Sequence, residues 1–302
     1  MELAIVIPYY KLDYFEECLN SLAIQTNKNF KVYIGDDASS QDPLEVIEKF
    51  KGSLDLVYHR FNENLGGISL TKQWHRCINL SQGERWLMLL GDDDYISENY
   101  VDEFYSHLKE IEKLDIKVVR FASRIVRNPS GECSKLYTHP RLERSTDFFF
   151  RKFLKFSRGS LTEQIFRRDA FLKHGFRDFT LGWGADNFAW LDFTEFGNVY
   201  SINDATAFFR ISERNISRGG YKEELKQGVK YSYFTLIIEV YLQEFQSHQR
   251  LPLLLFYEQV VYNNRKTNFR FWLKMCRMFY IEKAYLQILK FSRRILIHKF
   301  SK

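Results

Sequence analysis

The chain of 302 residues has room for one large domain, or for one domain with an appended segment. Hydrophobic residues at 45% and charged residues at 27% exclude wholesale disorder, and 5 Pro with 15 Gly exclude a collagen-like or low-complexity chain. The formal net charge of +6 is unevenly distributed, because residues 265–302 contain eleven Lys or Arg and one acid, Glu282, so the remainder is slightly acidic.

Patterns typical of strands and helices alternate through the first 127 residues. Residues 3–7 are a short, continuous apolar run, which is typical of a strand buried on both faces. A helix over 13–23 follows, with Asp13 as its N-cap. The same criteria predict helices over 68–80 and 98–114 and strands over 30–34, 54–58, 85–90 and 118–126. This alternation predicts an α/β protein with a mostly parallel sheet flanked by helices.

The regular pattern weakens after a turn signal at residues 128–131. We expect helices over 146–156 and 186–196 and strands over 164–166, 199–202 and 206–211. From residue 223 onward the sequence is helical in character, which predicts a C-terminal helical extension.

Cysteine usage and the N-terminus bear on location. The four cysteines lie far apart without a CxxC pair, which excludes a disulfide scaffold and a cysteine-based zinc site. The N-terminal apolar run is too short for a signal peptide, and no stretch approaches the roughly 18 apolar residues of a membrane span. We therefore expect a cytoplasmic protein.

Two acidic clusters follow predicted strands, at the edge where open parallel sheets bind ligands. Asp36 and Asp37 follow the second strand, and Asp92, Asp93 and Asp94 follow the fourth. Three consecutive carboxylates favour a hard divalent cation such as Mg²⁺ or Mn²⁺, with phosphate oxygens completing its shell. The alternative is a solvated acidic turn. Neither GxGxxG nor GxxxxGK[ST] occurs, so a metal is the better candidate for holding phosphate charge.

The first 100 residues resemble family 2 glycosyltransferases densely and in order. The resemblance rests on residues 4–10, 25–26, 32–40, 62–67, 83–86 and 89–94, which read AIVIPYY, QT, VYIGDDASS, NENLGG, GERW and LLGDDD. Residues 160–220 match more loosely, and 221–302 hardly at all. The resemblance implies a GT-A fold over residues 1–220, as a nucleotide-sugar-binding and catalytic domain, followed by a helical, basic and aromatic segment over 221–302. It also implies inverting transfer of a sugar, usually from a UDP-sugar, as in a hexosyltransferase for bacterial polysaccharide.

The resemblance also implies roles for residues of the donor site. Pro8, Tyr9 and Tyr10 would line the nucleotide pocket, and Asp37 would contact the base. Residues 92–94 would be a DXD-like element, in which Asp92 and Asp93 contact the donor.

The best candidates for ligands of the divalent metal, Mn²⁺ or Mg²⁺, are Asp93 and Asp94. Gly91 stands where the family has its usual first Asp, so the ligating atom is not fixed by the resemblance.

An inverting transfer needs one base to take the proton from the acceptor hydroxyl. The family's base is the Asp of a Glu-Asp pair at a helix start, and Asp186 takes that position here, with Ala185 in place of Glu. The alternative role for Asp186 is an ordinary helix N-cap, and Asp192 and Glu195 are reserve bases.

Two further residues take roles at the donor. Trp183 can stack on a sugar face, and Arg210, in a segment that resembles the family's mobile loop, can meet the diphosphate. Ser212 stands where some relatives carry a metal-binding His.

The basic segment over 265–302 interleaves cations with aromatic and aliphatic residues. This composition suits peripheral contact with an anionic membrane, which would place the protein at the inner face of the cell membrane near a saccharide or lipid-linked acceptor. The alternative is a helical subdomain with a solvated basic face. No RNA-binding motif occurs, so we do not expect a nucleic-acid partner.

Two function classes are therefore compared. The first is a metal-dependent, inverting glycosyltransferase. The second is a non-catalytic nucleotide-sugar-binding or membrane-scaffold protein with the same fold, which Ala185 and Gly91 favour. A nucleotidyltransferase is a weaker rival, because it would want a Gly-rich, basic segment after the first strand.

Overall fold

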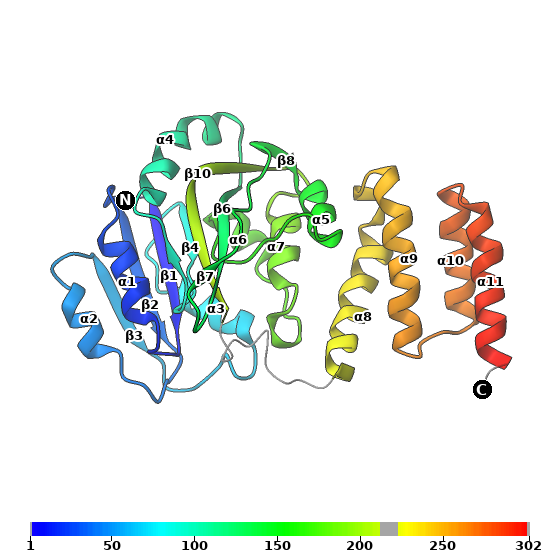
Figure 1. Cartoon of the computed structure of the whole chain (residues 1–302), viewed down its shortest axis with the longest axis horizontal. Helices are drawn as coiled ribbons and strands as arrows, with labels where there is room; N and C mark the ends of the chain where they lie inside the picture. Colours follow the sequence, from blue (N-terminus) through cyan, green and yellow to red (C-terminus); the bar gives the residue numbers. More distant parts are fainter. Residues whose placement is uncertain (1, 212–222, 301–302) are drawn as a thin grey trace. The chain divides into compact units, whose positions relative to one another are not determined.

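A computed structural model describes residues 2–211 and 223–300, with the side chains of residues 223 and 297–300 excepted (Figure 1). The chain divides into two compact units, Met1–Gly219 and Gly220–Lys302. The first unit is built on a ten-stranded sheet with the order β3-β2-β1-β4-β9-β6-β10-β5, and β7 and β8 pair with β6 and β10 outside this path.

The strands of the first unit are β1 (Leu3–Tyr9), β2 (Phe30–Asp36), β3 (Leu56–Arg60), β4 (Trp86–Leu89), β5 (Tyr95–Ile96), β6 (Val118–Arg127), β7 (Glu132–Cys133), β8 (Leu142–Arg144), β9 (Gln164–Arg167) and β10 (Asn198–Ile211). Its helices are α1 (Phe15–Ala23), α2 (Leu44–Phe50), α3 (Leu70–Ile78), α4 (Tyr100–Lys113), α5 (Ser145–Phe153), α6 (Arg168–His174), the 3₁₀ helix η1 (Thr180–Gly182) and α7 (Ala185–Phe193).

The predicted mostly parallel sheet is present. β3, β2, β1 and β4 run parallel to one another, and β6 runs parallel to β10. β9 lies antiparallel between β4 and β6, so the sheet is mixed at its centre.

Two apolar layers explain why the first strand reads as a continuous apolar run. Leu3, Ile5 and Ile7 pack in the core cluster that includes residues of α1, α2 and α4. Ala4 and Val6 pack in the cluster that includes residues of α3, α6 and α7. Because successive side chains of a strand point to opposite faces, a strand covered on both faces needs apolar residues at every position.

Several boundaries differ from the sequence-based predictions. The first helix begins at Phe15 after Tyr14, and no side chain caps it, so the prediction of Asp13 as N-cap is wrong. The third strand begins at Leu56 instead of residue 54. The two predicted strands over 199–202 and 206–211 are one strand, β10, with a break in register between Ile202 and Thr206. The seven-residue helices α2 and α6 were not predicted.

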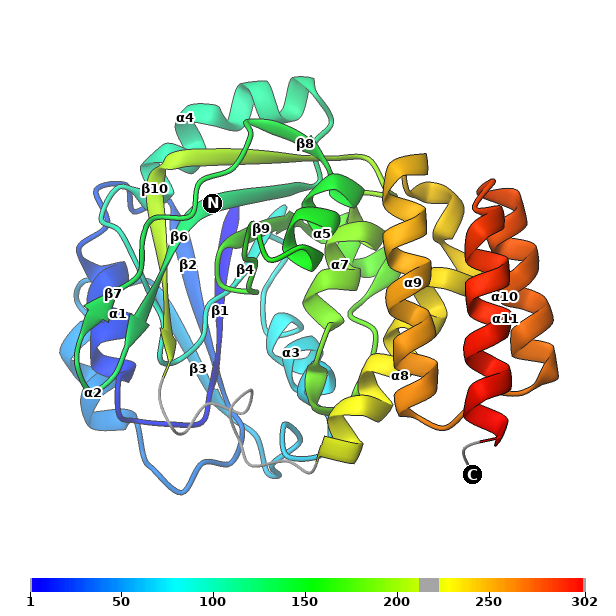
Figure 2. The same cartoon turned by 45° about the vertical axis from the view of Figure 1, so that its right-hand side comes forward.

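The second unit is helical within its described residues, as predicted. It contains α8 (Glu223–Val240), the 3₁₀ helix η3 (Leu242–Glu244), α9 (Ser247–Asn263), α10 (Phe269–Ile281) and α11 (Tyr285–Phe300). The four α-helices stand side by side in both views (Figures 1 and 2). Phe271, Phe279 and Phe291 pack ring against ring between α10 and α11. None of the helices in the described part of the chain has the length and apolar character needed to cross a membrane.

Candidate active site

The carboxyl ends of β1, β2 and β4 bring three loops together. Tyr9 at the end of β1 pairs in register with Asp36 at the end of β2, and the amide of Asp37 donates to the Tyr9 carbonyl at 3.0 Å. On the other side of β1, the Leu90 amide donates to the Val6 carbonyl at 3.0 Å. Both predicted acidic clusters therefore adjoin the segment that follows Pro8.

Asp92 fastens the acidic turn to this segment. Its Oδ2 accepts hydrogen bonds from the amides of Tyr10 and Lys11, both at 2.7 Å. Burial and the neighbouring charge of Asp93 raise the pKa of Asp92 to about 7, although the two amides oppose this shift. Burial also raises the pKa of Asp93, against the charges of Lys11 and Arg210.

Asp94 is held by residues that lie far away in the sequence. Its Oδ1 accepts the Arg210 amide at 2.8 Å, and its Oδ2 accepts the hydroxyl of Thr162. Burial and the charge of Asp93 raise the pKa of Asp94 to about 8. Asp94 is buried, Asp92 and Asp93 are partly buried, and all three carboxyls have raised pKa values. Such an oxygen-rich turn suits a hard divalent cation, because the cation would offset the mutual repulsion of the carboxylates.

The second acidic cluster is bound by its own loops. Asp36 accepts from the Ser39 amide at 2.8 Å, the Tyr58 hydroxyl at 2.7 Å and the Arg60 guanidinium at 2.7 Å. These contacts anchor Asp36 to β3 and to the start of the next loop.

Asp37, the predicted base-contacting residue, organises the segment that follows β3. Its carboxylate accepts from the amides of Leu65 at 2.8 Å and Gly66 at 2.9 Å, and it pairs with Arg76 of α3. A Cβ at Gly66 would lie 2.5 Å from Asp37 Oδ2, so only glycine allows this approach. Sequence reasoning missed Arg76. The available signal was that Arg76 lies on the predicted helix over 68–80, one face of which turns toward the acidic loop.

The residues predicted to line the nucleotide pocket differ in exposure. The Tyr9 ring is fully buried against Phe15, with centroids 4.6 Å apart, and its hydroxyl donates to the Gln41 carbonyl at 2.7 Å. Tyr10 is exposed, and Pro8 is partly buried. At this edge, Tyr9 therefore presents its backbone, whereas Tyr10 presents its side chain.

Asp186 lies in the first turn of α7. Gly182 and Gly184 have positive φ values of 66° and 84°, which turn the chain sharply into this helix. The N-cap is Gly184, and no side chain caps the helix, so the alternative role of Asp186 as N-cap is wrong. The carboxylate Oδ2 of Asp186 lies 3.3 Å from the Lys152 ammonium of α5, which also contacts the side chain of Asn187.

The reserve bases are both paired. Asp192 is buried and forms a two-point contact with Arg177, at 2.6 and 3.0 Å. Glu195 contacts Lys173 and His174.

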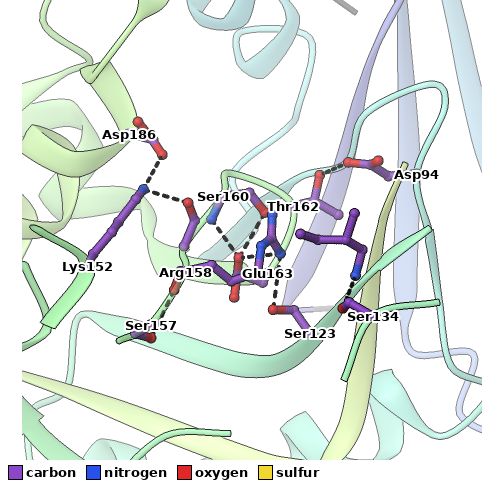
Figure 3. Close-up of polar contacts among 12 residues, drawn as sticks. Asp94, Ser123, Ser134, Lys152, Ser157, Arg158, Ser160, Thr162, Glu163 and Asp186 are labelled. Atoms are coloured by element: carbon purple, nitrogen blue, oxygen red, sulfur yellow. Dashed lines mark hydrogen bonds and ion pairs between the residues drawn. The ribbon is translucent and has the colours of Figure 1, made fainter. Parts of the chain in front are cut away.

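A segment over residues 157–163 lies between Asp94 and Asp186 (Figure 3). The Gly159 carbonyl accepts from Lys152 at 2.5 Å, and Thr162 donates to Asp94. Glu163 folds the segment on itself, since its Oε1 accepts from the Ser160 amide at 2.6 Å and the Arg158 guanidinium at 3.2 Å. Sequence reasoning missed this segment, because its partners, Asp94, Ser123, His139 and Lys152, come from four separate stretches of the chain and no short motif marks them.

Glu163 is expected to make the free energy of unfolding sensitive to acid. Burial alone would raise its pKa, but the charge of Arg158 and the nearby His139 ring, whose Nε2 lies 3.8 Å from Glu163 Oε2, lower the pKa to about 2. A carboxyl with a lowered pKa stabilises the fold fully above its unfolded pKa and loses that contribution as pH falls. Glu163→Gln should therefore cost about 3 kcal/mol of unfolding free energy at pH 7, and about half of that at pH 3.

Urea unfolding at the two pH values measures this difference. Glu132→Gln is the control, because Glu132 is exposed and its ion pair with Arg127 is long at 3.9 Å. An equal deficit for Glu163→Gln at pH 7 and pH 3 would contradict the linkage.

The remaining predicted site residues lie as follows. Arg210 is buried. Its guanidinium donates to the Asp93 carbonyl at 2.9 Å and to Glu17 at 2.5 Å. Trp183 is partly buried next to η1. Ser212 and the rest of the loop through residue 220 lie outside the described residues.

A second group of metal-capable side chains lies on α4 and β10. Among the described residues, ligand atoms of Glu103, His107 and Asp204 lie within 4.8 Å of one another. Nδ1 of His107 lies 2.9 Å from the Tyr200 hydroxyl, which leaves Nε2 facing Glu103 at 3.8 Å. None of the predicted metal ligands belongs to this group. The spacing of Glu103 and His107 was visible in the sequence, but the approach of Asp204 was not.

Comparison with known proteins links this geometry to sugar transfer. A family model described as Glycosyl transferase family 2 matches residues 4–175. A poly(ribitol-phosphate) beta-N-acetylglucosaminyltransferase, TarS of Staphylococcus aureus, is 26% identical over 197 residues, which cover 57% of this chain and 33% of that protein. The chain thus spans about a third of the length of that curated relative.

Solved structures share the fold. The crystal structure of S. aureus TarS 1-349 in complex with UDP-GlcNAc has a TM-score of 0.65 and 20% identity, covering 89% of this chain and 75% of that one. The mannosyltransferase PcManGT from Pyrobaculum calidifontis, in complex with GDP-Man and Mn²⁺, has a TM-score of 0.58 and 12% identity, covering 98% and 80%. At these identities the structures establish the fold alone, and the predicted GT-A fold is confirmed.

Proposed function

Because the chain belongs to glycosyl transferase family 2, we propose that it transfers a sugar with inversion from a nucleotide-sugar, preferably a UDP-sugar, to a hydroxyl of a saccharide or lipid-linked acceptor. The observation that carries this proposal is the partly buried acidic turn at the carboxyl edge of the sheet, where Asp92 hydrogen-bonds to the segment after β1. In this proposal residues 1–220 bind the donor and catalyse the transfer, and residues 221–302 are an appended helical segment.

The donor would lie over the loops that follow β1 and β2. Pro8, Tyr9 and Tyr10 line the nucleotide site, with Tyr9 contributing backbone because its ring is buried. Asp37 contacts the base. Support for this role comes from its position beside the Tyr9 carbonyl, although its carboxylate also holds Leu65 and Gly66. Donor binding would therefore depend on whether the loop that contains Leu65 and Gly66 is ordered.

Asp93 and Asp94 would hold the divalent metal, Mn²⁺ or Mg²⁺, with Asp92 contacting the donor beside them. The fit rests on the oxygen-only donor set, of which Asp94 is buried and Asp93 partly buried, and on the raised pKa values of Asp92 and Asp94. When bound, such a cation supplies positive charge for the leaving diphosphate. Arg210 stabilises the same turn through its contacts with Asp93 and Asp94, and its cation adds to the positive potential there.

Asp186 would take the proton from the acceptor hydroxyl as that oxygen attacks the anomeric carbon. Its carboxylate is partly exposed at the start of α7, so an acceptor can reach it. Trp183 would stack on the sugar. Lys152 keeps the Asp186 carboxylate in place and ties it to the Gly159 carbonyl.

Thermal-shift measurements with UDP, GDP, CMP and dTDP, each with Mn²⁺ or EDTA, test the donor site. A ligand that binds only the folded state raises the melting temperature. At a ligand concentration of a hundred times the Kd, the free energy of unfolding increases by about 2.7 kcal/mol. We expect a metal-dependent shift with one nucleotide, UDP first. The matching nucleotide-sugar should then be hydrolysed or transferred in a donor panel. No shift with any nucleotide would contradict the proposed pocket.

A non-catalytic nucleotide-sugar-binding or membrane-scaffold protein is the second candidate. Three observations favour it: Ala185 is buried where the family has Glu, Gly91 replaces the usual first Asp, and Lys152 neutralises Asp186. Binding of a nucleotide with no turnover of any sugar donor would support this candidate over the enzyme.

The proposal also includes location. We place the protein in the cytoplasm at the inner face of the cell membrane, with no nucleic-acid partner. The four cysteines are free thiols, which suits a reducing compartment.

A further inference from the structure

Helices α10 and α11 expose large apolar side chains along one stripe each. The stripe on α10 consists of Phe269, Leu273 and Tyr280, and the stripe on α11 of Tyr285, Leu289 and Leu296. Each of these six side chains is more than half exposed, from 55% for Tyr285 to 70% for Leu289. Ile281 and Leu286 are exposed as well but lie beside the stripes. Contiguous exposed apolar surface of this kind is unusual in a protein that remains free in water.

The two stripes lie on one face of the helix pair. Residues three, four, seven and eleven apart share a helix face, so each set of three forms a line along its helix. The rings of Tyr280 and Tyr285 lie 5.6 Å apart, which joins the two lines at the turn between the helices. The opposite sides carry the buried residues that pack within the unit, namely Phe271, Met275, Phe279 and Phe291.

Cations border this apolar face, and no exposed carboxylate accompanies them between residues 265 and 296. The sole acid there, Glu282, is largely buried and pairs with Arg250 at 3.3 Å. Lys274 and Arg294 pair with Glu239 and Glu258 of neighbouring helices. Within α10, α11 and the turn between them, the exposed cations without an ion pair to a described residue are Arg270, Arg277, Lys283, Lys290 and Arg293.

We propose that this face of α10 and α11 docks on an anionic lipid bilayer. The apolar stripes would enter the boundary between headgroups and acyl chains, while the bordering cations contact lipid phosphates. Charge decides between a bilayer and a second copy of the same face. Two such faces would bring like charges together, whereas an anionic surface complements all five cations.

The test is flotation of the full chain with vesicles of phosphatidylcholine alone, or of phosphatidylcholine with phosphatidylglycerol at seven to three. We expect the wild type to float with the anionic vesicles and to remain unbound with the neutral ones. Reversing three cations should lower the partition coefficient at least about a hundredfold. The variant carries Arg270→Glu, Arg277→Glu and Arg293→Glu.

A second variant removes apolar contacts without charge change. Leu273→Ser with Leu289→Ser should lower partitioning at least about tenfold. Its matched control is Leu172→Ser, since Leu172 is also 70% exposed but lies on α6 of the first unit. The control for charge reversal changes exposed lysines of the first unit, Lys72, Lys109 and Lys155, to Glu. Both controls should bind like the wild type.

Three outcomes would overturn the proposal. These are no flotation with anionic vesicles, equal loss in the controls, and oligomers that the Leu273→Ser and Leu289→Ser variant disperses without vesicle binding. The last result would identify a second copy of the chain as the occupant. Nucleotide binding by each variant, measured by thermal shift, separates this result from failure of the donor site.

Discussion

The Asp186→Asn variant is expected to transfer sugar about a thousandfold more slowly than the wild type, while it binds the nucleotide with unchanged affinity. The amide has nearly the same shape as the carboxylate but accepts no proton from an acceptor hydroxyl. The donor loops and the acidic turn follow β1, β2 and β4, whereas Asp186 lies on α7. Steady-state kinetics with the nucleotide-sugar, together with a thermal shift, measures both quantities.

Lys152→Met is the matched variant for Asp186→Asn. It removes the same ion pair, at 3.3 Å, but keeps the carboxylate. Because both groups are partly exposed, the pair contributes little to stability, about 1 kcal/mol at most. Transfer should fall by about tenfold or less in this variant. Full transfer by Asp186→Asn would exclude Asp186 as the base and direct attention to Asp192.

Removal of divalent metal with EDTA is expected to lower transfer by about a thousandfold, and Mn²⁺ or Mg²⁺ should restore it. Asp94→Asn keeps an acceptor for the Arg210 amide but loses one charge, so the apparent Kd for Mn²⁺ should rise at least about tenfold. Raised pKa values mean that protons compete with the metal. With pKa values of about 7 for Asp92 and about 8 for Asp94, apparent affinity should fall as pH decreases from 8 to 6.

The second metal-capable group provides the control. His107→Ala removes the nitrogen ligand from the group of Glu103, His107 and Asp204 without touching the acidic turn. Its metal dependence should equal that of the wild type. Metal-dependent transfer that is lost in His107→Ala and retained in Asp94→Asn would move the metal to α4 and β10.

The parts of the fold that were predicted correctly share a physical cause. β1 and β4 are covered on both faces and are apolar along their length, β2 is apolar except for Lys31 and Asp36, and α1, α3 and α4 carry apolar residues at helical spacing. α2 and α6 have seven residues each, too few for that spacing to stand out. The residues of β9 were predicted, but its direction was not. Alternation of strands and helices predicts parallel strands, whereas β9 runs antiparallel to both β4 and β6.

The site could be predicted only where one motif carries it. Asp37, the turn at Asp92–Asp94 and Asp186 follow strands or begin a helix in recognisable order. The residues that hold these side chains in place follow no such recognisable order in the sequence. Thr162 lies 68 residues from Asp94, and Lys152 lies 34 residues from Asp186. Such pairings depend on tertiary packing, and a single sequence does not encode them as a local pattern.

The hydrogen bond from Arg210 to Asp94 joins residues 116 positions apart. During synthesis the acidic turn leaves the ribosome well before Thr162 and Arg210. The contacts that these two residues make with the turn can therefore form only after the later segments have emerged. A nascent or truncated chain of the first 127 residues would hold every motif of the donor site up to Asp94, yet its acidic turn would lack both ties. Binding competence should thus be acquired late in translation, once β10 has left the exit tunnel and joined the sheet beside β6.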